Sequence, residues 1–332
     1  MGRHTKLGAA LVAAIGVAAG TAAHAAVQTA TNNILSVQIE DAGTAAGMFT
    51  IRTGASHPTP NATVFYPIGT SYITLRDNTA QVVYTNSGGG TNTNIAPYTE
   101  QALQAAPCAA TVAAITAGFR ATYVCPNWTV TQDVVINGTT LADTNVRQTV
   151  MVQNTSGVAR SYGVRYMWDW QIAGNDASLF RTRNPDGAFT ATFTGFSSPA
   201  FQAFEEVDSA VTPTFSVFGT VTGGSLSPAP TTPDRVVYAN WGDYYDAPWD
   251  FAIAGAGSDS ATAHFWGFAA PLSVAAGGTA TFHQYVSTNP SAVGVGPTQP
   301  AAAIPTLSEW ALIGLAGLVA LLGLRRARSL RI

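Results

Sequence analysis

The stretch YGVRYMWDW, residues 162–170, points to the fold class of this chain. Its side chains alternate between two faces, which is the period of a β-strand rather than that of a helix. The face with the larger apolar side chains carries Val164, Tyr166, Trp168 and Trp170, and the other carries Arg165, Met167 and Asp169. The alternation predicts a strand with one face turned toward a core.

The same period recurs on both sides of this stretch. The segments that share it are ILSVQIED (34–41), VRQTVMVQN (146–154), FTATFTGF (189–196) and ATFHQYVST (280–288). Turn-forming residues separate the segments, because Gly, Asn, Asp and Pro favour reversals of the chain. The predicted turns lie at Asp41–Gly43, Asn137–Gly138, Asn184–Gly187, Gly223–Gly224 and Gly277–Gly278.

One stretch has a helical composition, TEQALQAAPCAATVAAI at 99–115. Pro107 interrupts it, so we expect at most a short helix before the proline. Many short strands without crossover helices predict an all-β fold, a large antiparallel β-sandwich over residues 26–288.

The N-terminal segment, residues 1–25, has the pattern of a secretory signal peptide. Arg3 and Lys6 precede a run of small and apolar residues, and Ala23 and Ala25 occupy the two positions that a signal peptidase reads. Positive, apolar and small-residue regions in this order predict export by the Sec machinery and cleavage before Ala26. The alternative is an uncleaved N-terminal membrane helix.

The C-terminal segment mirrors the N-terminal one. A Pro- and Ala-rich linker (289–303) leads to a fifteen-residue apolar run from Trp310 to Leu324. As a helix this run is about 22 Å long, which is short for a bilayer core of about 30 Å. The arginines that follow, Arg325 and Arg326 first, favour a cytoplasmic end. A plain single-pass anchor in the membrane is one interpretation.

A second interpretation comes from a resemblance to a bacterial sorting signal. Ile304, Pro305, Thr306 and Leu307, followed by Trp310, the apolar run and the arginines, resemble the IPTL-CTERM domain, here residues 304–332. The resemblance implies a Gram-negative host and processing by an exosortase, a membrane-embedded cysteine protease or transpeptidase. The protein would be anchored transiently in the inner membrane and then reach the cell surface or the medium.

The body also resembles, more loosely, a group of exported proteins of unknown activity. The resemblance is carried by GVRYMWDWQIAGNDASLF (163–180) and SDSATAHFWGFAAPLSVAAGGTATFHQY (258–285). It implies a supersandwich of the galactose-mutarotase type. It brings no catalytic residue, because the histidine and glutamate pattern of the mutarotases is not recognisable in this sequence.

Composition restricts the partners of the body. Residues 26–303 contain nine arginines, no lysine and seventeen acidic residues, a net charge of about −8. Nucleic acids repel such a charge, so they are not expected as partners. The two cysteines, Cys108 and Cys125, are expected to form a disulfide in an oxidising compartment.

The segment NWGDYYDAPWDF, residues 240–251, contains the most concentrated group of candidate ligand-binding residues. Gly242 and Pro248 predict a loop, and aromatic rings with carboxylates suit the apolar faces and hydroxyl groups of sugars. The candidate residues are Trp241, Asp243, Tyr244, Tyr245, Asp246 and Trp249. The alternative is that these rings fill the end of the sandwich as part of its core.

Two acidic groups are further candidates. Asp169, Asn175 and Asp176 have the hard oxygen ligands that Ca²⁺ prefers, although their spacing is not that of an EF-hand. A turn stabilised by aspartate, with an ion pair to Arg165, explains them equally well. FEEVDS (204–209) is an acidic cluster, and carboxylates of this kind on adjacent strands could act in a glycosidase. Glu205 and Glu206 are not themselves such a pair, because adjacent residues point to opposite faces of a strand, and a solvated face is expected.

Together these features predict an exported surface or matrix protein with a structural or adhesive role. Extracellular polysaccharide is the partner that fits this role. A carbohydrate-active enzyme or carbohydrate-binding protein on the same scaffold is the alternative. Common nucleophile, phosphate-binding and zinc-protease motifs are not found in the sequence, which favours a protein without catalysis. A concave pocket with converging carboxylates would favour the carbohydrate class.

Overall fold

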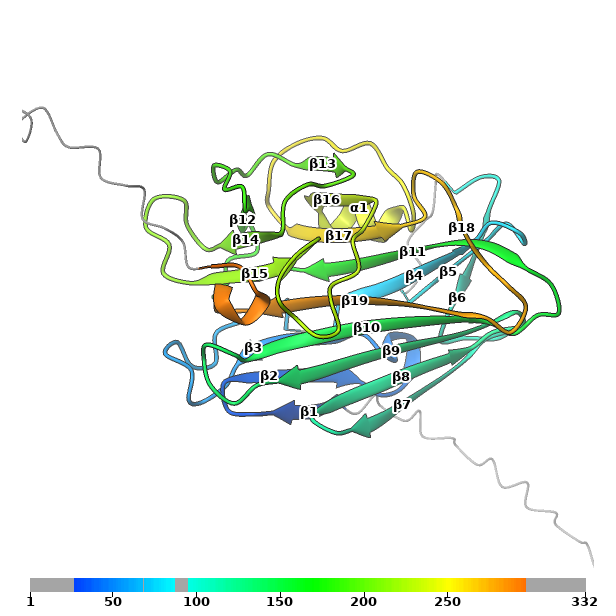
Figure 1. The fold of residues 1–332 in the computed structure, drawn as a ribbon, viewed down its shortest axis with the longest axis horizontal. Helices are drawn as coiled ribbons and strands as arrows, with labels where there is room; N and C mark the ends of the chain where they lie inside the picture. Colours follow the sequence, from blue (N-terminus) through cyan, green and yellow to red (C-terminus); the bar gives the residue numbers. More distant parts are fainter. Residues whose placement is uncertain (1–26, 68, 87–94, 297–332) are drawn as a thin grey trace, which may run out of the picture.

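The computed structural model describes residues 27–67, 69–86 and 95–296, which form three β-sheets (Figure 1). The first large sheet has the strand order β12 (Leu179–Arg183), β14 (Ala203–Val207), β15 (Ser216–Thr220), β19 (Thr279–Ser287), β10 (Asn145–Asn154), β9 (Trp128–Asn137), β8 (Gly118–Val124) and β7 (Ala109–Ile115). The second has the order β13 (Thr194–Ser197), β16 (Arg235–Asn240), β17 (Ser260–Trp266), β11 (Arg160–Asp169), β4 (Tyr72–Asp77), β5 (Val82–Thr85) and β6 (Thr99–Ala102), and β18 (Leu272–Val274) also pairs with β11.

The third sheet is small and contains β1 (Val27–Thr31), β2 (Leu35–Glu40) and β3 (Phe49–Thr53). The described helices are short: α1 (Trp241–Asp246) and the 3₁₀ helices η1 (Gly43–Ala45) and η2 (Pro290–Val293). Among the described strands, all pairings are antiparallel except that of β5 with β6.

Aromatic side chains join the two large sheets into a sandwich. Phe180 of β12 stacks on Tyr238 of β16, with ring centroids 5.2 Å apart, and Trp266 of β17 lies 5.0 Å from Phe282 of β19. Each such ring buries a large apolar area, so these contacts are a major part of the core. The predicted all-β sandwich is therefore confirmed.

Strand β11 lies inside the second sheet and is buried on both faces. Residues 162–170 are all buried, including Arg165 at 0% exposure and Asp169 at 2%. The expected alternation exists, but the second face is covered by α1 rather than by solvent. The Arg165 guanidinium donates hydrogen bonds to the carbonyl oxygens of Ala247 (2.7 Å) and Tyr244 (3.1 Å). The alternative ion pair of Arg165 with an aspartate turn is thus not formed.

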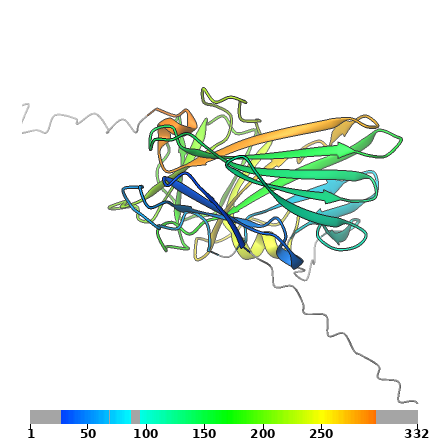
Figure 2. The ribbon, with the colours of Figure 1, turned by 90° about the horizontal axis from the view of Figure 1, so that it is seen from below.

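The small sheet packs against β8 and β9 of the first large sheet, as Figure 2 shows from below. Gln132 of β9 donates a hydrogen bond of 2.7 Å to the carbonyl oxygen of Gly47, and the Tyr123 hydroxyl of β8 donates one of 3.1 Å to Ala46. These bonds fix the turn between β2 and β3 on the larger sheet.

Most predicted strands correspond to strands of the structure. ILSVQIED, VRQTVMVQN and ATFHQYVST contain β2, β10 and β19. FTATFTGF is strand only in its second half, β13; Thr190 and Thr192 make isolated bridges to Phe180 and Ala256 instead. The predicted turn at Asn137–Gly138 connects β9 to β10, and Gly277–Gly278 connects β18 to β19.

The helix expected within 99–115 is wrong. Residues 99–102 form β6, which pairs with β5, and Ala109–Ile115 form β7, which pairs with β8 from Ala109↔Val124 to Ile115↔Gly118. Alanine favours helices in isolation, but tertiary pairing overrides that preference. The disulfide between Cys108 and Cys125 closes the open end of the β7–β8 hairpin, as the sequence predicted.

The body extends beyond the boundary expected at residue 288. Ala292, Val293 and Val295 are buried, and the two valines pack with Phe218 and Tyr285. The first part of the predicted linker therefore belongs to the body. The predicted signal peptide, residues 297–303 of the predicted linker and the sorting tail, with the helix predicted for its apolar run, lie outside the described residues.

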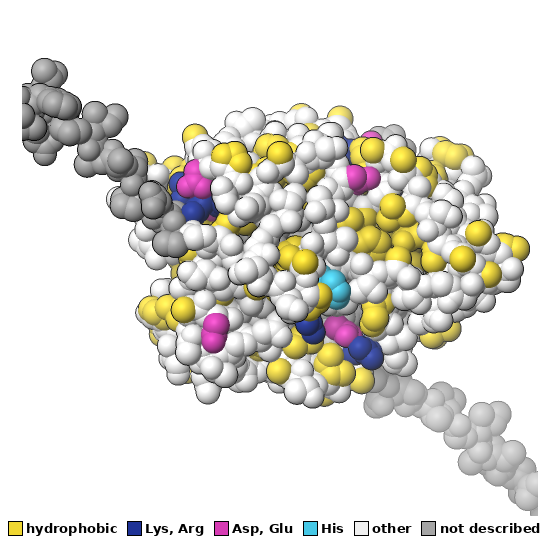
Figure 3. Space-filling view, viewed as in Figure 1, with side chains coloured by type: hydrophobic (Ala, Val, Ile, Leu, Met, Phe, Trp, Pro, Cys, Tyr) yellow, Lys and Arg dark blue, Asp and Glu magenta, His cyan; other side chains and the backbone are white. Residues whose placement is uncertain are grey.

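The described surface carries few charged side chains. On the face shown in Figure 3, basic and acidic side chains are scattered among uncharged ones. Within the described ranges, no helix combines the length and apolar character that a membrane span requires.

Candidate functional site

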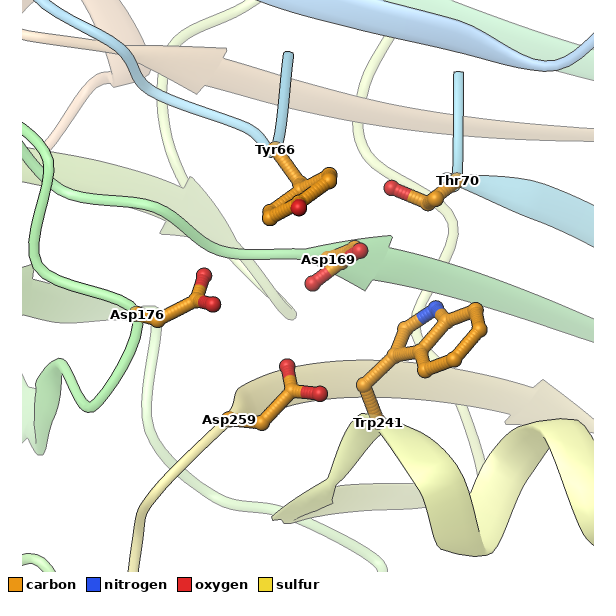
Figure 4. A pocket seen from close by; sticks show the side chains of 6 residues that line it. All are labelled: Tyr66, Thr70, Asp169, Asp176, Trp241 and Asp259. Carbon is orange, nitrogen blue, oxygen red and sulfur yellow. The ribbon is translucent and has the colours of Figure 1, made fainter. Parts of the chain in front are cut away.

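Three aspartates face a common pocket at the end of β11. The pocket has a volume of about 280 Å³ and is lined by Tyr66, Thr70, Asp169, Asp176, Trp241 and Asp259. Figure 4 shows the carboxylates of the three aspartates turned toward the same space, between the ring of Tyr66 and the indole of Trp241. Among the described residues that line the pocket, none is basic.

Backbone hydrogen bonds place these side chains. The carbonyl oxygen of Asp169 accepts from the amide of Tyr66 (3.1 Å), and that of Asp259 accepts from the amide of Trp241 (2.9 Å). The carbonyl oxygen of Asp176 accepts from both the amide and the hydroxyl of Ser260, at 2.8 and 2.9 Å. The main chains around the pocket are thus tied to one another, and the carboxyl groups remain directed inward.

The environment of the pocket favours the protonated forms of all three carboxyl groups. Burial raises the pKa of Asp169 well above its usual range, and the charges of Asp259 and Asp176 add to the effect. Burial raises the pKa of Asp176 as well. Burial, together with the nearby Asp176, raises the pKa of Asp259 to about 6. Carboxylates that repel one another in a low-dielectric site are a common feature of ligand-binding and catalytic pockets.

Three polar atoms at the pocket have no hydrogen-bond partner in the part of the chain that the structure describes. They are Asp169 Oδ1, Asp176 Oδ1 and Trp241 Nε1. Buried polar groups are generally paired, because leaving one unpaired costs about 1–3 kcal/mol. The pocket therefore presents acceptors and a donor that a bound molecule can satisfy together.

The structure brings two of the three predicted calcium ligands together. Asp169 and Asp176 line the pocket, but the Asn175 side chain is engaged elsewhere. Its amide donates to the carbonyl oxygen of Asp208 (2.8 Å), and its oxygen accepts from the amide of Ala177 (3.0 Å). Within the described residues, no three His, Cys, Asp or Glu side chains are arranged to hold a metal ion.

The segment 240–251 differs from the predicted loop. Residues 241–246 form α1, whose first turn is capped by Asn240 Oδ1 accepting from the amide of Gly242 at 2.8 Å. Tyr244 is fully buried, and Trp249 is 6% exposed and packs edge-on against Phe265 at 5.5 Å. These two rings belong to the core, which was the alternative interpretation.

The other candidates in this segment divide between the pocket and the surface. Trp241 lines the pocket and stacks on Tyr245, with centroids 5.0 Å apart. Asp246 is exposed and Asp243 is half-buried, and neither lines the pocket. Trp241 is thus the one member of the predicted set that lies in the carboxylate pocket.

The glutamates of FEEVDS are buried, in contrast to the solvated face expected for them. Glu205 is 4% exposed and forms ion pairs with Arg181 and Arg183. Glu206 is 0% exposed and accepts hydrogen bonds from Ser178 and Thr262. They point to opposite sides of β14, as predicted.

Three pocket residues were missed at the level of sequence: Tyr66, Thr70 and Asp259. Asp259 directly precedes β17, whose alternating pattern is recognisable. An acidic residue at the end of a predicted strand could therefore have marked Asp259 as a candidate. Tyr66 and Thr70 lie in the connection between β3 and β4, where no local pattern marks them.

Comparisons with known proteins give three results. The fold is similar to the crystal structure of a protein assigned as an aldose 1-epimerase, from Escherichia coli K12, with a TM-score of 0.48 and 10% identity over 80% of this chain and 99% of that chain. No curated protein matches the sequence. Residues 302–329 match the family described as the IPTL-CTERM motif, so the end of this chain carries that sorting motif.

Proposed function

We propose that the chain is an exported cell-surface or matrix protein that an exosortase processes through its C-terminal sorting signal. The observation that carries this proposal is the match of residues 302–329 to the IPTL-CTERM motif. The N-terminal pattern of residues 1–25 supports the same route, because a chain that reaches a membrane-embedded exosortase must first be exported.

Cell fractionation tests this proposal. We expect the protein with Ile304–Leu307 replaced by alanines to stay in the inner-membrane fraction, whereas the unmodified protein leaves it. Replacing Thr298, Gln299 and Ala301 with serines is the matched control, because these residues precede the matched motif and leave it unchanged. Equal distribution of the motif variant and the unmodified protein would contradict the proposal.

The carboxylate pocket supports a second function, the binding of carbohydrate. Carboxylates accept hydrogen bonds from sugar hydroxyl groups, and the faces of aromatic rings suit the apolar faces of sugars. The specific observation is that Asp169 Oδ1, Asp176 Oδ1 and Trp241 Nε1 are buried, unpaired and gathered at one concave site. Binding of extracellular polysaccharide there would give the protein an adhesive role.

A polysaccharide pull-down with the purified body, residues 26–296, tests the second function. We expect the Trp241→Ala variant to lose polysaccharide binding, because truncating an aromatic anchor commonly costs about 2 kcal/mol or more. Thermal melting of the same variant checks that it remains folded. Retention of polysaccharide equal to that of the unmodified body would place binding outside this pocket.

A further inference from the structure

We propose that the carboxylate pocket selects an amino sugar, whose protonated amine lies among Asp169, Asp176 and Asp259. This inference rests on the carbohydrate-binding function proposed above and adds the chemical group that the pocket distinguishes. The first argument is charge. Three carboxyl groups face the pocket, and its described lining contains no Arg, Lys or His to balance them. A neutral sugar would leave that repulsion in place, whereas a cationic group relieves it.

The second argument is the position of Asp169. Its side chain is 2% exposed, its Oδ1 has no partner among the described residues, and the carboxyl group points into the pocket (Figure 4). A buried carboxylate oxygen needs a donor, and an ammonium group brings three of them. Charge-assisted hydrogen bonds of this kind are about twice as strong as neutral ones.

The third argument separates an amino sugar from a bare metal ion. The described acidic side chains do not form a set that could hold one ion. Trp241 Nε1 is a donor without a partner at the same pocket, and a donor cannot ligate a cation. A molecule that satisfies the whole pocket must therefore carry an acceptor for the indole as well as donors for the carboxylates. A hydroxyl-bearing ring with an amine has both.

The fourth argument is size and shape. A volume of about 280 Å³ is close to the lower end of the range for small-molecule pockets, which suits a single ring. Trp241 is held by its stacking on Tyr245, so its indole is a fixed wall opposite Tyr66. Aromatic walls also attract a cation that lies within about 6 Å of a ring.

Calorimetric titration of the body, residues 26–296, with three related sugars tests the inference. Glucosamine carries the amine, N-acetylglucosamine carries the same nitrogen without a charge, and glucose has a hydroxyl group at that position. We expect glucosamine to bind roughly tenfold or more tightly than the other two, since hydrogen bonds to charged groups contribute about 1.5–3 kcal/mol. Asp259→Asn should weaken glucosamine binding about tenfold and leave glucose binding within about twofold.

Asp250→Asn is the matched control, because it removes the same charge from an exposed residue outside this pocket. It should leave all three affinities unchanged within about twofold. Equal affinities for the three sugars would overturn the amine inference and leave carbohydrate binding standing. Binding of none of them would overturn the amine inference, whereas the polysaccharide pull-down described above decides the carbohydrate function separately. Saturable binding of Ca²⁺ that Asp259→Asn abolishes, without any preference for glucosamine, would replace the amine with a metal ion.

Discussion

Glu206 shows how strongly burial can shift the pKa of one side chain in this protein. It lies on β14 with 0% exposure, where Ser178 donates a hydrogen bond of 2.8 Å to Oε2 and Thr262 one of 3.1 Å to Oε1. Burial raises the pKa of Glu206 to about 8, although the two hydroxyl groups oppose the shift. The folded protein therefore holds a proton that the unfolded chain releases above a pH of about 4.5.

The raised pKa gives a direction for the pH dependence of stability. Between a pH of about 4.5 and about 8, the folded state binds more protons at Glu206 than the unfolded state does, so rising pH lowers the free energy of unfolding. We expect Glu206→Gln to remove this contribution, because glutamine cannot ionise. The free energy of unfolding of the variant, relative to that of the unmodified protein, should therefore be higher at about pH 8 than at about pH 5. Urea denaturation of both proteins across this interval measures the difference.

Glu205 provides the contrast at the next position. It is ion-paired with Arg181 and Arg183, and Arg183 is only 3% exposed. Glu205→Gln should therefore destabilise the protein at both pH values, by about 1–3 kcal/mol, because the buried Arg183 loses its buried partner and keeps only the more exposed Asp186. A Glu206→Gln variant that keeps the full pH dependence of the unmodified protein would contradict the assignment of this dependence to Glu206.

At the scale of elements, the segment 240–251 shows what local sequence could and could not predict. Asn240 before Trp241 is a recognisable helix cap, so the start of α1 could have been predicted from it. The hydrogen bonds of Arg165 to the carbonyl oxygens of Tyr244 and Ala247 could not be predicted from local sequence, because they depend on β11 lying beneath α1 in the fold. Gly163 of β11 likewise leaves room for Trp249, since a Cβ there would lie 2.6 Å from the indole.

The two tryptophans of this segment should respond differently to truncation. Trp249 packs against Phe265, and the Arg76 guanidinium carbon lies 4.0 Å from its ring centroid, so Trp249→Ala should destabilise the body by about 3–5 kcal/mol. Trp241 is half-buried, and Trp241→Ala should cost only about 0.5–1.5 kcal/mol through its lost stacking on Tyr245. Thermal denaturation separates the two. Equal losses of melting temperature would mean that Trp241 is a core residue.

The β7–β8 hairpin depends on its disulfide. Cys108 and Cys125 lie 17 residues apart, just outside the two ends of the paired strands. Replacing both with serine should lower the free energy of unfolding by about 2–4 kcal/mol, because the cross-link restrains the unfolded chain. Dithiothreitol should destabilise the unmodified protein similarly and leave the double variant unaffected. Two alkylatable thiols in the native exported protein would contradict this prediction.

At the scale of the whole molecule, the sequence predicted the class of fold but not the order of its strands. Alternation in single segments identifies strands such as β10 and β19, because each needs only its own side-chain pattern. Their pairing is set by long-range contacts. The carboxylate pocket is the clearest case: β11 ends at Asp169, its neighbour β17 begins after Asp259, and only the pairing of these strands brings the two aspartates together.

The last prediction concerns the ends of the chain. If both terminal segments are recognised, the protein recovered outside the cell should begin at Ala26 and lack the arginines at 325–331. The reason is that a signal peptidase and an exosortase would each read one of the two signals, so each cut is made separately. Intact-mass measurement of the secreted protein gives both ends at once. The Ile304–Leu307 alanine variant, recovered from the inner-membrane fraction, supplies the control in which only the N-terminal cut should remain. A mature species that still ends at Ile332 would contradict exosortase processing, and its recovery in the membrane fraction would favour the plain membrane anchor.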